Sequence, residues 1–402
     1  MFDRIAFVAA VLVFSSTVHA QLLDFQSAYT KLIERDLDLK TREFEVESAR
    51  ARRLRQLGTF LPSLSVDVSQ SRSGEPVTDW RQSGAVVASA NLFRSGADYA
   101  GAKASGRDVD ASEETLVAQK QKAEDAAIET LMSYISSRRR REITEKVVAL
   151  RADSLKVARE RYARGILPQQ EVDKVSIDLE NSRARLTDAE AEEATARASM
   201  SAALGTSSEI AIEWPWKEAL TSGVKLEEKA FLIQKLPSYR ASLSNVEAED
   251  YRRHQARAGL LPSLDFSASY GNENFAQPDR RDWSAAITLS IPLFEKFQGW
   301  SATSIQRAAY ETALVRREAI IRSAQAEAES LKRSFRAARE SALARERTAK
   351  VTERLYNDNQ QRFRLGRASV NDLAIDQDCL LQSQLLEVEG WSKAHTSLAR
   401  LC

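Results

Sequence analysis

The tetrapeptide Leu61-Pro62-Ser63-Leu64 occurs again 200 residues further along the chain, as Leu261-Pro262-Ser263-Leu264. Two further matches lie at an offset of 201. Leu92-Phe93 recurs as Leu293-Phe294, and Arg161-Tyr162-Ala163-Arg164-Gly165 recurs as Arg362-Phe363-Arg364-Leu365-Gly366. Because separate matches share nearly one offset, the sequence indicates that one structural half is duplicated. Solenoid repeats have periods of 20–50 residues, so they do not explain an offset of this length.

Long helices are predicted in both halves. Of the 402 residues, 29% are charged and 43% are hydrophobic, while Gly and Pro together occupy 22 positions (14 and 8), a composition typical of long helices and coiled coils. No proline occurs in 77–167 or 293–402, and proline is what most strongly interrupts a helix. A heptad pattern of apolar residues follows Ile321, Ala324, Ala328, Leu331, Phe335, Ala338 and Ala342. A helix over about 97–161 would be ~95 Å long.

Short strands interrupt this helical pattern. After each Leu-Pro-Ser-Leu, apolar residues alternate with Ser and Asp, and the return segments 83–92 and 282–291 alternate as well, the first less strictly because Val87 falls on the other face. Strands of about 9–11 residues are long enough to cross a bilayer when tilted. One apolar and one polar face suits lipid on one side and water on the other. A soluble β-sandwich is the alternative, but it does not explain the long helices.

Aromatic residues recur at the ends of the strands. Trp80 and Trp283 lie at equivalent ends of the two hairpins, with Tyr270 near the second loop, and Phe93 and Phe294 lie at the opposite ends. Such positions are typical of membrane-interface girdles. Four strands cannot close around water, and open strand edges are unstable in lipid. The sequence therefore predicts that three copies share a 12-stranded barrel, since eight strands leave only a packed interior.

The N-terminus is predicted to be a targeting segment. Arg4 is followed by an apolar run from Ile5 to Phe14, and Val18-His19-Ala20 fits signal-peptidase cleavage before Gln21. A buried N-terminal helix is the alternative. The two cysteines, Cys379 and Cys402, are expected on one helix about 35 Å apart, too far for a disulfide.

The predicted organisation starts with a signal peptide over 1–20 and has two structural repeats, 21–205 and 225–402, separated by an equatorial segment over 206–224. The first repeat is expected to contain a helix over 24–58, strands over 63–71 and 83–92, and helices over 95–162 and 168–205. The second is expected to contain a helix over 225–259, strands over 263–271 and 282–291, and helices over 296–363 and 369–402.

This arrangement resembles the TolC-type family of outer-membrane efflux and secretion channels over nearly the whole mature chain. The resemblance rests on the duplicated Leu-Pro-Ser-Leu, Leu-Phe and Arg-aromatic-x-x-Gly motifs and on Leu204-Gly205, which closes the first half. It implies a mainly α protein with transmembrane β-strands, in which a homotrimeric α-barrel in the periplasm continues into a shared β-barrel in the Gram-negative outer membrane. It implies three partners: outer-membrane lipid, a periplasmic adaptor, and an inner-membrane pump or ABC exporter.

The resemblance also implies that two helix-turn-helix tips form the periplasmic entrance. The family's acidic constriction residue matches Glu171 and Asp372. A second family aspartate falls on Ile375, one residue before Asp376. The entrance positions are expected to include Tyr162, Phe363, Arg164, Arg364 and Arg367. The turns expected to contact an adaptor contain Gly165, Ile166, Leu167 and Pro168 in the first half and Gly366, Ala368 and Ser369 in the second.

Local chemistry gives simpler interpretations of several of these residues. Glycine at each tip suits a C′ position of positive φ, and Pro168 suits position N1 of the next helix. Ser369-Val370-Asn371-Asp372 has the spacing of a capping box, so Asp372 has a structural role open to it besides gating. Tyr162 and Phe363 are equally consistent with helix packing. The run from Arg138 to Arg141 is either a solvated helix face or a contact site for an acidic partner.

Several function classes are disfavoured. A formal net charge of +1 gives no electrostatic basis for binding nucleic acid. Three histidines and the absence of HExxH, CxxC and Gly-rich phosphate motifs disfavour an enzyme, a cofactor or a metal site. The remaining alternative to a channel is an exported periplasmic coiled-coil scaffold or adaptor without a pore. The sequence does not indicate the transported substrate.

Overall fold

The computed structural model describes residues 21–22, 25–71, 81–205, 210–211, 233–272 and 281–400. The chain divides into two compact units. The first is drawn from Met1–Asp36, Ala123–Lys225 and Leu331–Cys402, and the second from Leu37–Lys122 and Leu226–Ser330. The predicted signal peptide, Trp80 and Cys402 lie outside the described residues, as does the predicted equatorial segment apart from two of its residues.

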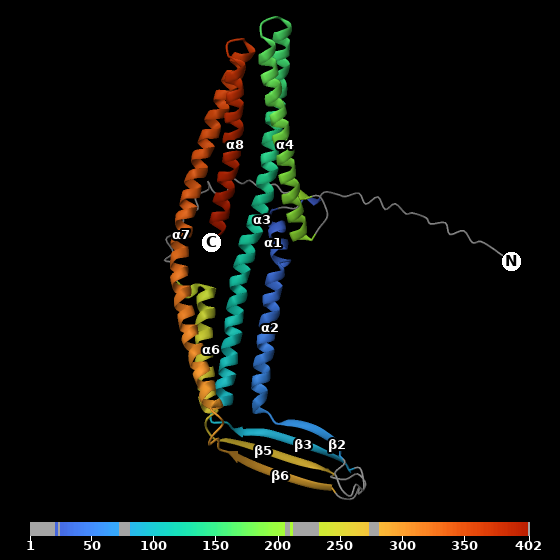
Figure 1. Ribbon diagram of the computed structural model, residues 1–402, viewed down its shortest axis with the longest axis vertical. Coiled ribbons are helices and arrows are strands. Elements are labelled where there is room, and N and C mark those ends of the chain that lie inside the picture. Colours follow the sequence, from blue (N-terminus) through green and yellow to red (C-terminus); the bar gives the residue numbers. More distant parts are fainter. Residues whose placement is uncertain are drawn as a thin grey trace, which may run out of the picture. The chain divides into compact units, whose positions relative to one another are not determined.

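The elements follow one another twice in nearly the same order (Figure 1). The first half contains β1 (Gln21–Leu22), α1 (Phe25–Glu34), α2 (Leu37–Leu57), η1 (Gly58–Phe60), β2 (Ser63–Ser71), β3 (Arg81–Phe93), α3 (Ala97–Ala163) and α4 (Gln169–Leu204). After β4 (Ile210–Ala211), the second half contains η2 (Ile233–Lys235), α6 (Pro237–Ala258), β5 (Ser263–Asn272), β6 (Arg281–Ser290), α7 (Gln298–Arg364) and α8 (Val370–Ala399).

The two halves keep one register over their long helices. α3 and α7 are each 67 residues long, and both their first and last residues differ by 201 in number. α4 and α8 also begin 201 residues apart. Each residue of one tip region therefore has a defined equivalent in the other, which is what a duplicated structural half predicts. The mainly helical fold with its duplicated unit is confirmed.

Two predicted boundaries are corrected. The helix expected over 24–58 is two helices, α1 and α2, because the chain turns at Arg35 and Asp36, and aspartate favours a helix N-cap over a helix interior. Of the helix expected over 225–259, residues 225–232 lie outside the described residues; the described part is interrupted at Leu236, between η2 and α6, which begins at Pro237. Leu236 is extended, with φ −68° and ψ 128°, because a residue before proline is driven out of the helical region.

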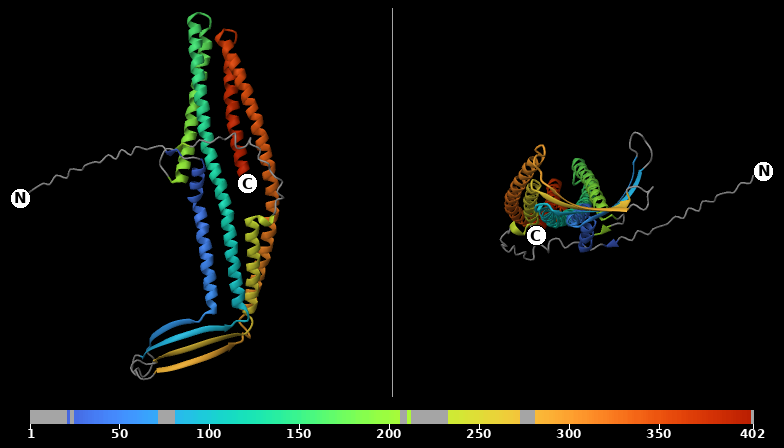
Figure 2. Two further views of the ribbon diagram at one scale, coloured as in Figure 1. Left: turned by 180° about the vertical axis from the view of Figure 1, so that it is seen from behind. Right: turned by 90° about the horizontal axis from the view of Figure 1, so that it is seen from below.

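In the second unit, an antiparallel sheet has the strand order β2-β3-β5-β6 (Figure 2). Its register aligns apolar side chains on one face, as in the row Val66, Val86, Tyr270 and Trp283. Serine hydroxyls bond across the other face, with Oγ–Oγ distances of 2.7 Å for Ser63–Ser89, 2.8 Å for Ser69–Ser83 and 2.9 Å for Ser269–Ser284. The two faces thus differ in chemistry as the alternating pattern predicted.

The helices of the second unit are joined by ion pairs across their surfaces. Arg252 and Arg240 of α6 pair with Asp108 and Glu114 of α3 at 2.5 and 3.4 Å. On another face of α3, Glu113 pairs with Arg50 of α2 at 2.7 Å. Ion pairs therefore join α3 to α2 on one side and to α6 on the other. The heptad residues Ala324 and Ala328 of α7 are buried as well.

In the first unit, the hairpins α3–α4 and α7–α8 pack through apolar clusters. One cluster joins all four helices near the turns and includes Leu155, Val175, Phe363, Leu373 and Leu380. Another joins α1 to α3 and α4, and a third fills the α7–α8 hairpin around Phe335 and Trp391. Within the described ranges, none of the helices combines the length and the apolar character that a membrane-spanning helix needs.

Candidate functional site

The two tips of the first unit are built from the same turn. Gly165 has φ +71° and Gly366 has φ +76°, the left-handed conformation that glycine adopts without a Cβ penalty. In the first tip, the N–H of Gly165 donates to the Tyr162 carbonyl at 2.8 Å and that of Ile166 to the Arg161 carbonyl at 3.0 Å. This pair of bonds is the Schellman motif. The second tip repeats it with 3.0 and 2.8 Å bonds to the carbonyls of Phe363 and Arg362.

The helices that follow the turns begin at equivalent N-cap residues. Pro168 is the N-cap of α4, with ψ 154°, and is not at position N1 as the sequence suggested, because the first helical residue is Gln169. Ser369, its equivalent, caps α8 in a capping box: its Oγ accepts the Asp372 N–H at 3.1 Å, and an Asp372 carboxylate oxygen accepts the Ser369 N–H at 3.2 Å. Hydrogen bonds to Ser369 lower the pKa of Asp372. The capping interpretation of Asp372 is confirmed, and its carboxyl stays exposed.

The predicted entrance residues occupy different environments. Glu171 lies in the first turn of α4 and pairs with Lys174 at 2.8 Å. Asp376 accepts a short hydrogen bond from Asn359 of α7, so its carboxylate is held within its own hairpin. Ile375, at the position where the family resemblance implies a second aspartate, is exposed. Of the carboxylates, Glu171 and Asp372 remain the pair at equivalent helix starts.

The remaining tip residues divide between the surface and the contact between hairpins. Arg364 pairs with Asp153 of α3 at 3.1 Å. Arg164, Ile166 and Arg367 are exposed around the turns. Leu167 and Ala368 are partly buried against the apolar cluster of the tips. The turn residues expected to contact an adaptor are thus exposed only in part.

The two aromatic residues before the glycines differ in burial although they are equivalent. Phe363 is 2% exposed and Tyr162 is 47% exposed. Phe363 belongs to the apolar cluster of the tips, and the guanidinium carbon of Arg161 also lies 4.3 Å from the centre of its ring. The same guanidinium donates a short hydrogen bond to the Phe363 carbonyl. Phe363 therefore packs in a contact between the two hairpins.

Sequence reasoning missed the polar contacts that join the hairpins deeper in the unit. Arg151 of α3 donates to the Asp378 carboxylate at 2.6 Å and to the Asp178 carbonyl at 2.8 Å. Gln377 Nε2 donates to Ser154 Oγ at 2.9 Å. Arg161, which also contacts the other hairpin, is the only residue of these contacts that the sequence singled out, because it is the first residue of the repeated Arg-aromatic-x-x-Gly motif. Among the described residues, no group of three or more His, Cys, Asp or Glu side chains is arranged to hold a metal ion.

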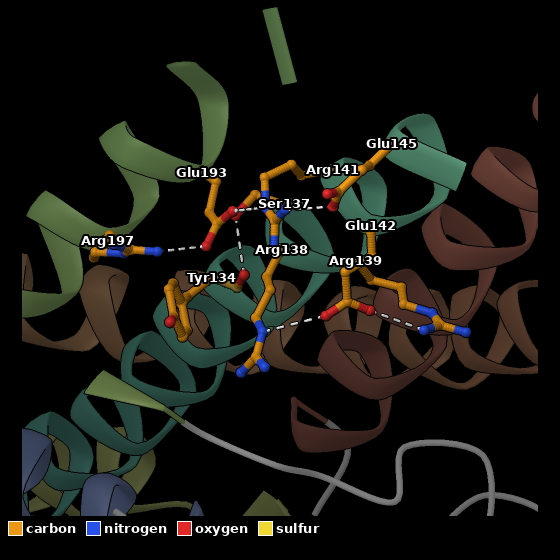
Figure 3. A network of polar contacts seen from close by, with 9 residues as sticks. All are labelled: Tyr134, Ser137, Arg138, Arg139, Arg141, Glu142, Glu145, Glu193 and Arg197. Carbon is orange, nitrogen blue, oxygen red and sulfur yellow. Dashed lines mark hydrogen bonds and ion pairs between the residues drawn. The ribbon is translucent and has the colours of Figure 1, made fainter. Parts of the chain in front are cut away.

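The run of four arginines on α3 is paired within the chain, and Figure 3 shows the contacts of Arg138, Arg139 and Arg141. Arg138 and Arg139 both pair with Glu142, and Arg140 pairs with Glu192. Arg141 pairs with Glu145 at 2.8 Å and with Glu193 at 2.5 Å. Within the chain, these arginines therefore already pair with acidic side chains. One interpretation of this run had assigned that contact to an acidic partner.

Glu193 is the centre of this network. Its side chain is 5% exposed and also binds Arg197 at 2.7 Å. Burial alone would raise the pKa of Glu193, but hydrogen bonds from Arg197 and Arg141 outweigh burial and lower it. The network borders a groove of about 440 Å³ whose lining includes Glu190, Ala194 and Ala198.

The second repeat has no charge at the positions equivalent to Arg141, Glu190 and Glu193. Arg141 and Glu193 correspond to Ala342 and Ala394, which are both buried. Glu190 corresponds to Trp391, which is fully buried in the α7–α8 hairpin. One hairpin is therefore joined at this level by a buried ion pair and the other by an aromatic side chain.

The aromatic residues of the second unit lie on the exposed apolar face of the sheet and at one of its ends. Tyr270 and Trp283 are direct register partners, and Trp283 is 76% exposed. Phe93 ends β3 and is exposed. Phe294 follows β6 and contacts the Phe297 ring edge-to-face, with 5.7 Å between ring centres. These positions fit contacts outside the chain.

The sequence matches the outer membrane efflux protein family over residues 28–206 and 232–402, so the chain belongs to this family. The family consists of channels and not of enzymes, and the resemblance stated from the sequence is confirmed. Among curated protein sequences, none matches the chain significantly.

Solved structures of outer-membrane channels share the fold. CusC, whose structures describe conformational changes accompanying folding and transmembrane channel formation, matches with a TM-score of 0.83 and 16% identity, over 100% of this chain and 97% of its own. The CmeC outer membrane channel of Campylobacter jejuni matches with a TM-score of 0.80 and 14% identity, over 94% and 84%. The outer membrane protein VceC of Vibrio cholerae matches with a TM-score of 0.76 and 15% identity, over 94% of both chains.

Proposed function

We propose that the chain is the outer-membrane exit channel of a tripartite efflux pump or a type I secretion system, and that it works as a homotrimer. Its sheet would lie in the outer membrane and its helical tips would form the periplasmic entrance. The partners would be a periplasmic adaptor and an inner-membrane pump or ABC exporter. The family and the likeness to channel structures support this proposal over a scaffold without a pore.

The observation that carries the proposal is the exposed apolar face of the four-stranded sheet. Leu64, Val66 and Val68 of β2 and Ile287 and Leu289 of β6 are all more than half exposed. Monomeric soluble proteins rarely expose a continuous apolar surface of this kind. The other face carries serine and aspartate. Contact with lipid suits the apolar face, and contact with water suits the face that carries serine and aspartate.

The edges of the sheet explain why more than one copy is needed. Within the described residues, β2 and β6 each pair with only one neighbouring strand. An unpaired strand edge in hydrocarbon leaves backbone N–H and C=O groups unsatisfied, at a cost of several kcal/mol per group. Pairing of β6 of one copy with β2 of the next removes both edges. Three copies give twelve strands, which is enough to surround water.

The test compares two neighbouring positions of β6 on opposite faces. Ile287→Arg places a charge on the face assigned to lipid, where it should cost about 2–4 kcal/mol near the bilayer midplane. Thr288→Arg, on the other face, should be tolerated. Membrane fractionation and native mass measurement in detergent should give an outer-membrane trimer for the wild type and for Thr288→Arg, with loss of the assembled trimer for Ile287→Arg. A wild-type protein that stays monomeric and outside the membrane would refute the proposal.

A further inference from the structure

The long helices α3 and α7 each follow a strand, β3 and β6, through a short turn (Figure 1). The two turns have the same backbone conformation. Before α3, Ser95 has φ +50° and Gly96 has φ +86°. Before α7, at the equivalent positions 201 residues further along, Lys296 has φ +50° and Phe297 has φ +65°. A backbone hydrogen bond of 2.9 Å spans each turn.

Phe297 is the unusual residue of the second turn. A left-handed conformation favours glycine, because a Cβ atom comes close to the following carbonyl oxygen, and a bulky residue adopts it only rarely. The first repeat has Gly96 here. The Phe297 ring is 71% exposed and contacts the Phe294 ring edge-to-face. The chain therefore holds an aromatic ring in an unfavourable conformation without burying it, and such outliers point to a function.

Phe297 belongs to a group of apolar side chains that are exposed together. Leu293 is 93% exposed, and Phe294 and Trp300 are each more than two-thirds exposed. Trp300 lies in the first turn of α7. Three aromatic rings and a leucine are thus presented within eight residues, at the end of the sheet where the chain enters the helix.

This group extends the apolar face of the sheet. Ile287 and Leu289 of β6 lie on that face, and Ile291, the first residue after the strand, is exposed as well. Every second residue from Ile287 to Leu293 is therefore an exposed aliphatic side chain. Whatever covers the apolar face of β6 would also reach the turn.

The turn also presents a positive charge. Lys296 is exposed, and among the described residues it has no ion pair or side-chain hydrogen bond. The adjacent Glu295 lines a groove of about 420 Å³ together with Arg94. Aromatic rings beside a lysine suit a membrane interface, because the rings lie at the level of the headgroups while the ammonium group reaches out to them.

We propose that this turn binds a phospholipid of the periplasmic leaflet of the outer membrane. Leu293, Phe294, Phe297 and Trp300 contact the upper part of the acyl chains, and Lys296 binds the phosphate, so an anionic phospholipid binds better than a zwitterionic one. We name these five residues the lipid anchor. The inference rests on the proposed function, because it requires the sheet to lie in the outer membrane.

Two observations favour lipid over a second copy of the chain or another protein. The apolar residues of the anchor continue from the face assigned to lipid, and the unpaired Lys296 complements the charge of a phosphate. The first repeat keeps the turn but has Gly96 and Ser95 in place of Phe297 and Lys296. The anchor is therefore a property of the second repeat alone.

Fluorescence quenching locates the anchor relative to the bilayer. The trimer is placed in nanodiscs of phosphatidylcholine with bromine on the acyl chains. The contribution of Trp300 is the difference between the wild type and Trp300→Phe, and the contribution of Trp283, on the apolar face of the sheet, is obtained from Trp283→Phe. Both tryptophans should be quenched by the brominated lipid.

A second measurement addresses the headgroup. In nanodiscs that mix phosphatidylglycerol with phosphatidylcholine, native mass measurement gives the lipids that the released trimer retains. Lys296→Gln should reduce the preference for phosphatidylglycerol roughly fivefold, which corresponds to about 1 kcal/mol for one lysine near an anionic surface. Lys120→Gln is the matched control, because Lys120 is exposed on α3 and, within the described ranges, has no ion pair. It should retain the wild-type preference.

The strained residue gives a third test. Phe297→Gly introduces the residue of the first repeat into the same turn. It should reduce the amount of lipid retained, while the unfolding midpoint in detergent stays at or above that of the wild type, because the strain is removed. A lower midpoint with unchanged lipid retention would show that Phe297 has only a structural role and would overturn the anchor.

The outcomes separate this inference from the proposed function. Quenching of Trp283 without quenching of Trp300 would overturn the anchor and leave the channel in place. If Trp300 is shielded from an aqueous quencher as well as from the brominated lipid, a second copy covers the turn and the anchor is again overturned. An unchanged lipid preference in Lys296→Gln would refute the binding of phosphate by this lysine. Absence of quenching at both tryptophans would overturn the membrane location of the sheet and the anchor together.

Discussion

The guanidinium of Arg151 lies 2.6 Å from the carboxylate of Asp378, although the two residues belong to different repeats. Arg151 is almost fully buried, and its other terminal nitrogen donates to the backbone carbonyl of Asp178 on α4. One arginine of α3 thus binds both α4 and α8. Asp378 also receives a hydrogen bond from Arg185 at 3.2 Å. The join between the hairpins therefore depends on a charge that is partly removed from water.

Asp378→Asn should destabilise this join. The substitution keeps the size of the side chain but leaves the buried Arg151 without its carboxylate, at a cost of about 1–3 kcal/mol. Hydrogen exchange on the detergent-solubilised protein should become faster in α8 near residue 378 and in the facing part of α3. Glu180→Gln is the control, because Glu180 is exposed and, among the described residues, pairs only with Arg183 of its own helix. Equal exchange in the two variants would contradict the assigned role of Asp378.

The turn at the second tip gives a conformational prediction. Gly366 has φ +76°, and a side chain in this left-handed conformation costs about 1–2 kcal/mol. Gly366→Ala should lower the unfolding midpoint of the tip. Limited proteolysis between α7 and α8 measures this midpoint. Gly106→Ala is the matched control, because Gly106 lies inside α3 with no atom within 4 Å of an added Cβ. There the alanine should be neutral or stabilise the helix by up to about 1 kcal/mol.

The repeat allowed much of this fold to be predicted from sequence. Equal spacing of the Arg-aromatic-x-x-Gly motifs placed both tips, and the observed α3 and α7 have equal lengths and one offset. Local signals were sufficient there, because a glycine C′ residue and the absence of proline decide helix ends without help from distant residues. The buried heptad residues of α7, such as Phe335 and Ala342, follow from periodicity in the same way.

Contacts between the repeats could not be predicted in this way. Tyr162 and Phe363 occupy the same position of the repeated Arg-aromatic-x-x-Gly motif, yet Tyr162 is exposed and Phe363 is buried, since residues of the other hairpin cover only Phe363. The carboxylate of Asp376 is held by Asn359, 17 positions away on another helix. Periodicity reports which face of a helix is buried, but not which helix covers it.

The buried ion pair of Arg141 and Glu193 should show strong energetic coupling. Glu193→Ala alone leaves Arg141 and Arg197 without their shared carboxylate, which should cost about 1–3 kcal/mol, because Arg141 keeps its pair with Glu145 and Arg197 is partly exposed. Adding Arg141→Ala should recover part of this loss, because alanine already occupies both equivalent positions of the second repeat, at Ala342 and Ala394. Unfolding midpoints of the wild type, both single variants and the double variant form a double-mutant cycle. Additive losses would contradict a direct interaction.

The same glutamate predicts a pH dependence. Since hydrogen bonds from Arg197 and Arg141 lower the pKa of Glu193 in the folded protein, its contribution to stability is complete above its ordinary pKa of 4.5. The contribution is lost as the pH falls through the lowered folded value. The difference in unfolding midpoint between wild type and Glu193→Gln should therefore be constant at neutral pH and shrink below about pH 4. Glu192→Gln, at a more exposed pair with Arg140, should show little difference at any pH.

The carboxylates at the helix starts provide the test of gating. Glu171 and Asp372 each lie six residues after a tip glycine, so the proposed trimer would place six carboxylates near its entrance. Like charges at short distance attract counterions, and multivalent cations applied from the periplasmic side should therefore block the channel. Glu171→Gln with Asp372→Asn removes the charge but preserves size, and asparagine retains an oxygen that can accept the Ser369 N–H at the capping box. In planar bilayers this double variant should show weaker block, while Glu180→Gln, further along α4, should behave as the wild type. Unchanged block in an intact double-variant trimer would leave Asp372 as a helix cap and Glu171 as the partner of Lys174, with the gate located elsewhere.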